Sequence, residues 1–278
     1  MKTIAARFGL AVGLIALTVS YGSAQTAEEW TQIKKLNWQF AGSQGNIGTE
    51  AVLQVPKGFA FLGSADASRF IELQGNPPMA NHFILAPMNL KWFSAFVFEP
   101  IGYVKDEEKI DPDELLETLK KSNLEDQQQR RQKGLQVLVL EGWFIPPHYD
   151  VQTKRLEWGT KLRTENNGLI VNYTIKLLGR KGVMDAIVVS DPENLDRDVN
   201  EFKSVLSSYS FTSGERYTEF RSGDKVAEYG LAALIIGGAA AAAAKSGALK
   251  GLMKFIWVGA IAIGAACWSY VKRLFRKA

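Results

Sequence analysis

The sequence predicts an α+β fold in which about three helices pack on a mostly antiparallel sheet. Four consecutive strand-like segments occupy residues 135–190, with only short turns between them. Short turns cannot form parallel crossovers, so these four strands are expected to form an antiparallel meander. Three helical patterns interrupt the strands at wide intervals and do not alternate with them one for one, which favours α+β over α/β.

The first part of the chain predicts short strands around two helices. Trp30, Ile33 and Leu36 are spaced as in a short helix that leads into a first strand near Phe40. Gly42–Gly48 is rich in turn residues and is expected to be a loop. The remaining elements expected here are strands at 49–55, 59–62, 83–86 and 92–98 and a helix at 64–73, with the last two strands paired.

The clearest helix start lies at Asp111. This aspartate can cap, Pro112 suits the first helical position, and Glu114 stands three residues after the cap. We expect the helix to run to about Gln132 and its almost wholly polar end, 125–133, to be solvated. The leucines expected to face the core are Leu115, Leu116, Leu119 and Leu124.

The predicted meander begins with a strand at 135–145 that Pro146-Pro147 should end. Its other strands are expected at 155–163, 169–178 and 183–190. A last helix follows Pro192, a strand follows at 209–211, and residues 216–225 form a polar bridge. The helices are expected to cover one or both faces of a single sheet. Sandwiches of the photosystem oxygen-evolving-subunit/Mog1-like fold have a similar element content, a likeness that carries no function.

The two ends of the chain predict export and anchoring. Residues 1–24 have a basic start, an apolar centre and small residues before Gln25, as in a secretory signal. The alternative, an uncleaved first membrane helix, is weaker because the apolar centre is shorter than the ~20 residues that a span needs. We expect an extracytoplasmic domain at 25–225 and a membrane anchor with a basic tail at 226–278.

The anchor contains two apolar runs, Gly230–Ala244 and Phe255–Val271, joined by a connector with three lysines. A single span at the second run places the four terminal cations in the cytoplasm, as the positive-inside tendency favours. A hairpin of two spans is the alternative, which places those cations outside. Small residues on both runs would suit packing on a neighbouring helix, so an oligomer through the tail stays open.

Charge and cysteine content limit the function classes. The formal charge is +4 overall, but the basic residues concentrate at the ends and leave −4 for residues 25–225. This balance argues against nucleic acid as a partner of the folded domain. Cys267, the single cysteine, lies in the second apolar run, so one chain can form neither a disulfide nor a thiolate metal site. We expect a protein of the bacterial inner membrane, with its main domain on the periplasmic side.

No catalytic constellation stands out. Both histidines, His82 and His148, follow proline-containing turns and are expected to be exposed loop residues, without the spacing of metal ligands. No Gly-x-Ser-x-Gly sequence occurs, and the Asp106–Glu108 carboxylates, among lysines, are typical of a solvated face. We therefore assign no catalytic residue, metal or cofactor.

Some residues remain as candidates for a binding surface. Gly179–Gly182 carries two cations between glycines and could hold an anion, although a tight hairpin turn explains it more simply. Residues 142–150 concentrate aromatics beside a rigid turn and could contact a partner, although an edge strand is the commoner explanation. The candidates are Glu99, Tyr103, Asp106, Trp143, His148, Tyr149, Arg180 and Lys181.

Six stretches with distinctive motifs stand in order along the chain, namely Leu53–Phe59, Gly75–Pro78, Phe98–Asp106, Gly142-Trp143 with Pro146–Asp150, Leu178–Gly182 and Asp224–Ala233. Together they resemble one bacterial family, the domain-of-unknown-function 2167 family of predicted membrane-anchored proteins. The resemblance covers nearly all of residues 25–277, and it implies export and anchoring but no activity, substrate or site residue.

The function that follows is a non-enzymatic one. We expect the extracytoplasmic domain to bind a protein or envelope component while its tail holds it at the membrane. One alternative is an envelope hydrolase acting through Glu99, Tyr103, Asp106 or His148, which requires these side chains to converge in one pocket. Another is a small-molecule or lipid sensor with a pocket between sheet and helices.

Overall fold

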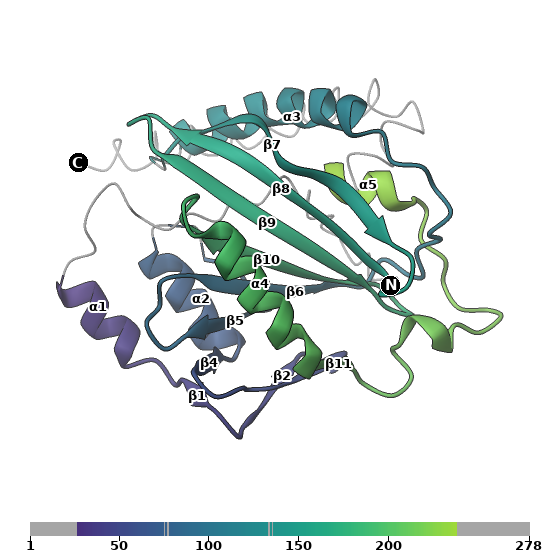
Figure 1. Ribbon diagram of the computed structural model, residues 1–278, viewed down its shortest axis with the longest axis horizontal. Helices are drawn as coiled ribbons and strands as arrows, with labels where there is room; N and C mark the ends of the chain where they lie inside the picture. Colours follow the sequence, from purple (N-terminus) through teal and green to yellow (C-terminus); the bar gives the residue numbers. More distant parts are fainter. Residues whose placement is uncertain (1–26, 75, 77, 133, 135, 238–278) are drawn as a thin grey trace, which may run out of the picture.

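The computed structural model describes residues 27–74, 76, 78–132, 134 and 136–237 (Figure 1). The expected signal segment at 1–24 and the expected span at 255–271 lie outside these residues. Within the described part, no helix is both long enough and apolar enough to cross a membrane.

An eight-stranded antiparallel sheet forms the centre of the fold, in the order β1-β4-β5-β6-β10-β9-β8-β7. The four-strand meander is confirmed as β7 to β10, and the pairing of β5 with β6 is confirmed as well. The strands are β1 (Gln39–Phe40), β4 (Phe59–Leu62), β5 (His82–Pro87), β6 (Phe93–Glu99), β7 (Leu138–Asp150), β8 (Arg155–Thr164), β9 (Leu169–Leu178) and β10 (Val183–Ser190).

A second sheet of three strands was not expected. It consists of β2 (Gln44–Ile47), β3 (Ala51–Gln54) and β11 (Tyr209–Phe211), in the order β11-β3-β2. The expectation of a single sheet was therefore wrong, as was the loop at Gly42–Gly48. That segment contains β2, in which Gly45 and Ile47 alternate inward although turn residues surround them.

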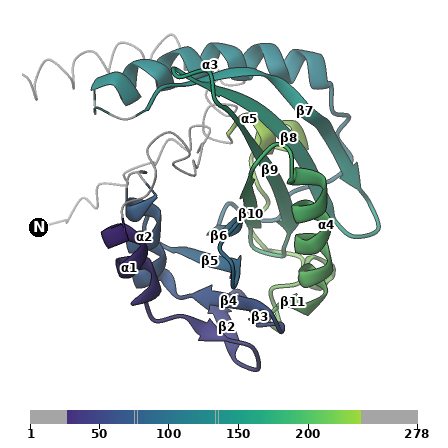
Figure 2. The same ribbon diagram turned by 60° about the vertical axis from the view of Figure 1, so that its left-hand side comes forward.

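Helices cover both faces of the large sheet (Figure 2). On the face that we call the outer face lie α4 and the small sheet; on the inner face lie α2, α3 and α5. The α+β class is confirmed. The helices are α1 (Ala27–Lys34), α2 (Ser64–Leu73), α3 (Pro112–Gln132), α4 (Leu195–Val205) and α5 (Leu231–Ile236), with 3-10 turns η1 (Leu206–Ser208) and η2 (Tyr217–Glu219).

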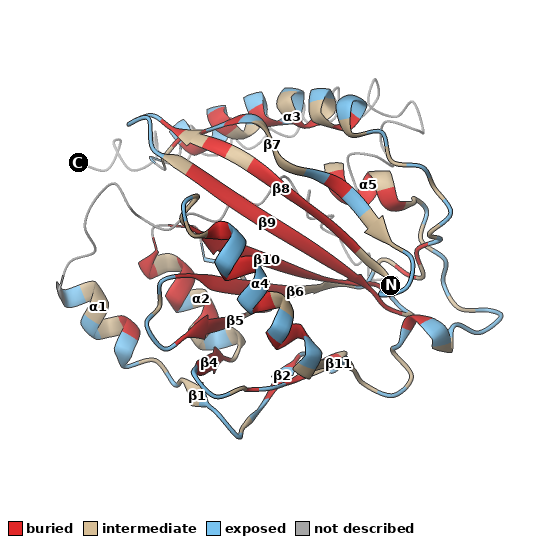
Figure 3. Ribbon diagram, viewed as in Figure 1, coloured by how far each residue is buried: buried red, intermediate tan, exposed pale blue. Residues whose placement is uncertain are grey.

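Burial follows these layers (Figure 3). The outer face is closed by an apolar cluster that includes Trp92, Phe96 and Phe202. The inner face carries two separate apolar clusters, one under α2 and one under α3 and α5. Because both faces are covered, almost every residue of β9 and β10 is buried.

Strand β7 does not end at its prolines. It continues through Pro146-Pro147 to Asp150, with shifts in register between Leu140 and His148. Because β7 is the edge strand of the sheet, a proline without an N–H donor costs no ladder hydrogen bond on the open side. The proline rule ended the predicted strand too early for this reason.

Helix α3 begins as predicted but buries different residues at its far end. Asp111 Oδ1 accepts from the backbone N–H groups of Asp113 and Glu114, at 3.1 and 3.2 Å. Leu115 and Leu119 are buried, whereas Leu124, which was expected in the core, is 61% exposed. In its place the amide of Asn123 bonds the backbone of β7. The expected solvation of residues 125–133 is confirmed for most of the described ones, such as Glu125 and Gln128, but not for Gln127 and Arg130. The buried polar residues are Asn123, Gln127 and Arg130.

The chain stays packed beyond Lys225, where the domain was expected to end. Val226 forms a parallel bridge with Tyr103, and the short helix α5 buries Leu231, Leu234 and Ile235 against α3 and β8. The first residues of the apolar run at 230–244 therefore belong to the domain core.

Candidate functional site

The candidate site lies where the loop after β6 meets the segment before α5. We call residues 216–230 the strap. Its backbone runs beside residues 101–104: Tyr103 N–H donates to the Lys225 carbonyl and Ala227 N–H donates to the Tyr103 carbonyl, both at 2.8 Å. Figure 1 shows the strap along one end of the molecule, between β11 and α5.

Arg180 and Lys181 fasten the β9–β10 turn to this end of the fold. The Arg180 guanidinium donates twice to the Asp224 carboxylate, at 2.7 Å each, and lowers the pKa of Asp224 to about 2. Lys181 pairs with Glu215. Because these cations already hold carboxylates of the chain, the turn is a clasp for the strap and not an open anion site.

The glycines of that turn are required because neighbouring segments pack closely against them, and not because the turn has a positive φ there. The tight hairpin turn expected at 179–182 is confirmed, but neither Gly179 nor Gly182 adopts a left-handed conformation. A Cβ at Gly182 would lie 2.1 Å from the Glu99 carbonyl oxygen, and one at Gly179 would lie 2.9 Å from the Phe211 ring. Only glycine lets the neighbouring segments pack at these distances.

Tyr103, Asp106 and Tyr149 come together in one polar cluster beside the strap. Tyr149 donates its hydroxyl to Asp106 at 2.6 Å, and Lys154 donates to the same carboxylate oxygen at 2.7 Å. Burial would raise the pKa of Asp106, but these hydrogen bonds outweigh it and lower that pKa. The rings of Tyr103 and Tyr217 stack at 4.4 Å, and Tyr217 donates to the Val104 carbonyl.

Glu99 belongs to a second cluster, on the inner face of the sheet. Lys176 Nζ lies 2.5 and 2.6 Å from the two oxygens of Asp185 and 3.5 Å from Glu99. Lys176 and Asp185 are buried. Burial lowers the pKa of Lys176, but the two carboxylates outweigh it and the net shift is upward. One cation faces two acids.

The second acid of this triad is therefore only partly neutralised. Burial raises the pKa of Asp185 to about 7, against the attraction of Lys176 and with the repulsion of Glu99. The triad can take up or release a proton near neutral pH. Tyr229 of the strap is close enough to feel all three charges, and burial together with Glu99 raises its pKa.

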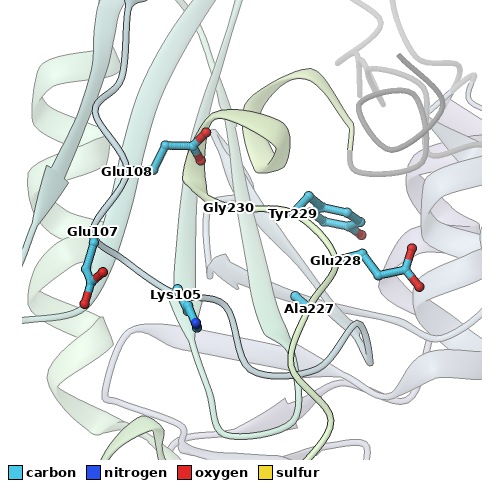
Figure 4. Close-up of a pocket in the computed structure, with 7 residues that line it drawn as sticks. All are labelled: Lys105, Glu107, Glu108, Ala227, Glu228, Tyr229 and Gly230. Carbon is cyan, nitrogen blue, oxygen red and sulfur yellow. The ribbon is translucent and has the colours of Figure 1, made fainter. Parts of the chain in front are cut away.

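A pocket of about 320 Å³ opens between the loop and the strap (Figure 4). One wall comes from the residues that lead into α3 and the other from the strap just before α5. Three carboxylates and one ammonium line it, so its charge is negative. The lining residues are Lys105, Glu107, Glu108, Ala227, Glu228, Tyr229 and Gly230.

Glu108 links this pocket to the start of α5. Its Oε2 accepts from the Ala232 backbone N–H at 3.1 Å. A Cβ at Gly230 would lie 2.2 Å from the same oxygen, so a side chain at that position would displace the carboxylate. The pocket wall and the first turn of α5 are thus one unit.

The other candidates lie elsewhere. Trp143 donates its indole N–H to the Pro112 carbonyl at 2.9 Å and supports the start of α3. His148 lies 3.7 Å from Glu157, whose carboxylate also accepts from Tyr173 and pairs with Lys203 of α4. His148 is thus on the outer face, away from Glu99, Tyr103 and Asp106.

Both histidines lie in strands and not in loops. His82 starts β5, is 6% exposed and has its pKa lowered by burial, so the expectation of an exposed loop residue was wrong for it. His148 lies within β7 and is exposed. Among the described residues, no three His, Cys, Asp or Glu side chains are placed to hold a metal ion.

Several residues of the site were not singled out from the sequence, chiefly Lys176, Asp185 and Tyr229. A signal for the first two was present. With a turn at 179–182, Leu178 pairs with Val183, and the same register sets Lys176 opposite Asp185. A cation and an anion directly opposite each other on two adjacent strands indicate a cross-strand ion pair, although its burial depends on what covers that face.

The chain belongs to the family described as a protein of unknown function (DUF2167), whose model matches residues 41–267. No curated protein matches it. Among solved structures, it is similar to the solution structure of cyanobacterial PsbP (CyanoP) from Synechocystis sp. PCC 6803. That match has 9% identity and a TM-score of 0.34, and covers 62% of this chain and 98% of the other. At this TM-score the likeness carries no inference about function.

Proposed function

We propose that this protein is a membrane-held binding module. Its tail anchors the domain on the extracytoplasmic face of the inner membrane, and the domain binds a protein or envelope component without catalysing a reaction. The observation that carries the proposal is the pocket between loop and strap. Around the pocket, Arg180 and Tyr149 hydrogen-bond to carboxylates of the chain and so serve the fold. Glu108 of the pocket wall accepts from the backbone of α5, the helix that leads into the tail.

The geometry favours binding over hydrolysis. A hydrolase would need its nucleophile, base and acid to face one position. Tyr103 and Asp106 lie in one cluster, Glu99 lies in another with Lys176, and His148 is on the opposite face of the sheet. These four side chains therefore do not face one common position at which a substrate bond could be cleaved.

The packing of α5 supports an anchor with one crossing. Leu231–Ile236 are committed to the core, which leaves only residues 238–244 of the first apolar run. This remainder is far shorter than the ~20 residues that a membrane-spanning helix needs. Residues 255–271 form the run that is long enough to cross with its flanks. This topology keeps the four terminal cations inside.

Crosslinking tests the binding proposal. The full-length protein would be crosslinked in its own membrane and the products identified by mass spectrometry, with a pocket variant, Tyr229→Ala, and a remote surface variant, Leu124→Ala. We expect one specific partner whose crosslinks map to the pocket walls, are reduced by Tyr229→Ala and are kept by Leu124→Ala. Absence of any specific partner for the full-length protein and for a tail-less form would overturn the proposal.

A small-molecule sensor is the second candidate, and the size of the pocket favours it. A volume of about 320 Å³ falls at the lower end of the range of small-ligand sites. The negative lining suits a cationic or amine ligand. Screening amines by thermal shift tests this: a ligand should raise the melting temperature of the wild type and fail to do so for Glu228→Ala.

A further inference from the structure

The strap exposes apolar side chains at the root of the tail. Phe220 is 39% exposed and Val226 is 40% exposed, whereas Leu231, which begins α5 directly after the strap, is buried. We call the surface formed by Phe220, Arg221, Lys225 and Val226 the tail-root surface.

This surface is continuous and held in place. The Phe220 ring packs on Tyr103 with ring centroids 4.2 Å apart, and Val226 is bridged to the backbone of the same tyrosine. Tyr103 in turn stacks on the buried Tyr217. The exposed side chains therefore belong to one rigid patch and not to a loose loop.

The charge of the patch is positive although the domain is acidic. Arg221 and Lys225 are both exposed and lie between the two apolar side chains in sequence. Asp224, the acid in this stretch, accepts hydrogen bonds from two nitrogens of the Arg180 guanidinium. Within residues 220–226 the exposed charged side chains are therefore Arg221 and Lys225.

The position of the patch indicates what covers it. Val226 lies four residues before Gly230, and the described fold ends at Gly237, with 41 residues still to follow, including the apolar run at 255–271. The tail leaves the domain after α5, which follows the strap directly in the chain. Aromatic and apolar side chains beside lysine and arginine are the composition found at a membrane–water interface.

We propose that the tail-root surface rests on the phospholipid surface of the membrane that the tail anchors to, with Phe220 and Val226 at the level of the headgroups. This inference rests on the proposed anchoring. It fixes the orientation of the domain: the tail-root surface faces lipid, and β1, at the far edge of the large sheet, faces away.

Fluorescence quenching in reconstituted membranes tests the orientation. Full-length protein with Cys267→Ser would carry one new cysteine, Phe220→Cys, Val226→Cys or Arg221→Cys, labelled with a polarity-sensitive fluorophore. Controls would carry the label at Phe40 on β1 or at Met88 in the β5–β6 turn, both more exposed than Phe220. The vesicles would contain phosphatidylcholine and phosphatidylglycerol, with or without a nitroxide near the headgroup.

We expect the nitroxide lipid to reduce fluorescence at positions 220, 221 and 226 and to leave positions 40 and 88 unchanged. Arg221→Cys and Val226→Cys keep the inference testable if loss of the Phe220 ring disturbs folding. Equal quenching at all positions, or none at the strap in protein that resists alkaline extraction, would overturn the orientation alone. Protein that alkali washes off the vesicles would overturn the proposed anchoring.

Discussion

The two faces of the large sheet are built differently. The outer face is filled by aromatic and aliphatic side chains, with Phe202 of α4 between Trp92 and Phe96. The inner face carries a row of buried polar residues between its two apolar clusters, namely Thr160, Asn172, Thr174, Lys176 and Asp185. Both faces therefore contribute apolar burial to stability. Apolar residues in place of a buried ion pair often give an equally or more stable fold. The inner face carries in addition a triad of one cation and two acids that stability alone does not require.

The largest effect should come from breaking the outer face. Phe202→Ala removes a fully buried ring that contacts two other aromatics, so we expect the free energy of unfolding to fall by about 3–5 kcal/mol. Urea unfolding of the detergent-solubilised full-length protein measures this loss. Leu124→Ala on the exposed side of α3 is the matched control and should change it by less than about 0.5 kcal/mol. A comparable loss for both variants would contradict the contribution of the outer face to stability.

On the inner face, removal of one charge should cost almost as much. Lys176→Met leaves the buried Asp185 and the partly buried Glu99 without their cation, and we expect a loss of about 3–5 kcal/mol. The double variant Lys176→Met with Asp185→Leu removes the buried pair together and should recover most of that loss. If the double variant is as unstable as the single one, the fold requires this ion pair for its stability, contrary to our inference.

The same triad should make the stability of the protein depend on pH. The pKa of Asp185 is raised to about 7, against 3.8 as its ordinary value. Between about pH 4 and 7 the folded protein keeps a proton that the unfolded chain has lost, so stability falls as pH rises through this window. Melting temperatures from pH 4 to 8 should show this slope for the wild type and a weaker one for Asp185→Asn, which has no proton to lose there.

Asp224 should act with the opposite sign at lower pH. Its pKa is held at about 2 by Arg180, so the folded protein stays ionised there while the unfolded chain takes up a proton below pH 4. Stability from the clasp is therefore lost as pH falls from about 4 to 2. Asp224→Asn should remove this loss of stability between pH 4 and 2. It should leave the fall in stability between pH 4 and 7 in place, so the variant distinguishes the contribution of Asp224 from that of Asp185.

Local sequence patterns predicted the outline of the fold. The meander, α2 and α3 follow from turn glycines, caps and hydrophobic spacing, and Phe59–Leu62 and Leu169–Leu178 have the predicted bounds. These signals are local, so a single chain carries them in full. The small sheet depends on the pairing of β3 with β11, more than 150 residues away, and no local pattern encodes that contact.

Burial of polar residues was the part that the sequence could not supply. In β9, alternate residues Asn172, Thr174 and Lys176 have the pattern of a strand with one solvated face, yet the inner face is covered. Similarly, Asn123 replaces Leu124 in the core because its amide satisfies the backbone of β7 at 2.9 and 3.0 Å. Which polar group finds a buried partner depends on the tertiary arrangement. The candidate site was therefore only partly predictable.

The finest test of the difference between the faces uses two neighbouring residues of β7. Tyr149 points to the inner face, where it donates to Asp106, and His148 points to the outer face, where it is 53% exposed beside Glu157. Tyr149→Phe removes a half-buried hydrogen bond to a charged acceptor and should lower the free energy of unfolding by about 1–2 kcal/mol. His148→Ala breaks a long, exposed contact and should change it by less than about 0.5 kcal/mol. The two positions share one strand, so a general disturbance of β7 would lower the free energy of unfolding of both variants equally. A larger loss for Tyr149→Phe than for His148→Ala would therefore reflect the different surroundings of the two side chains.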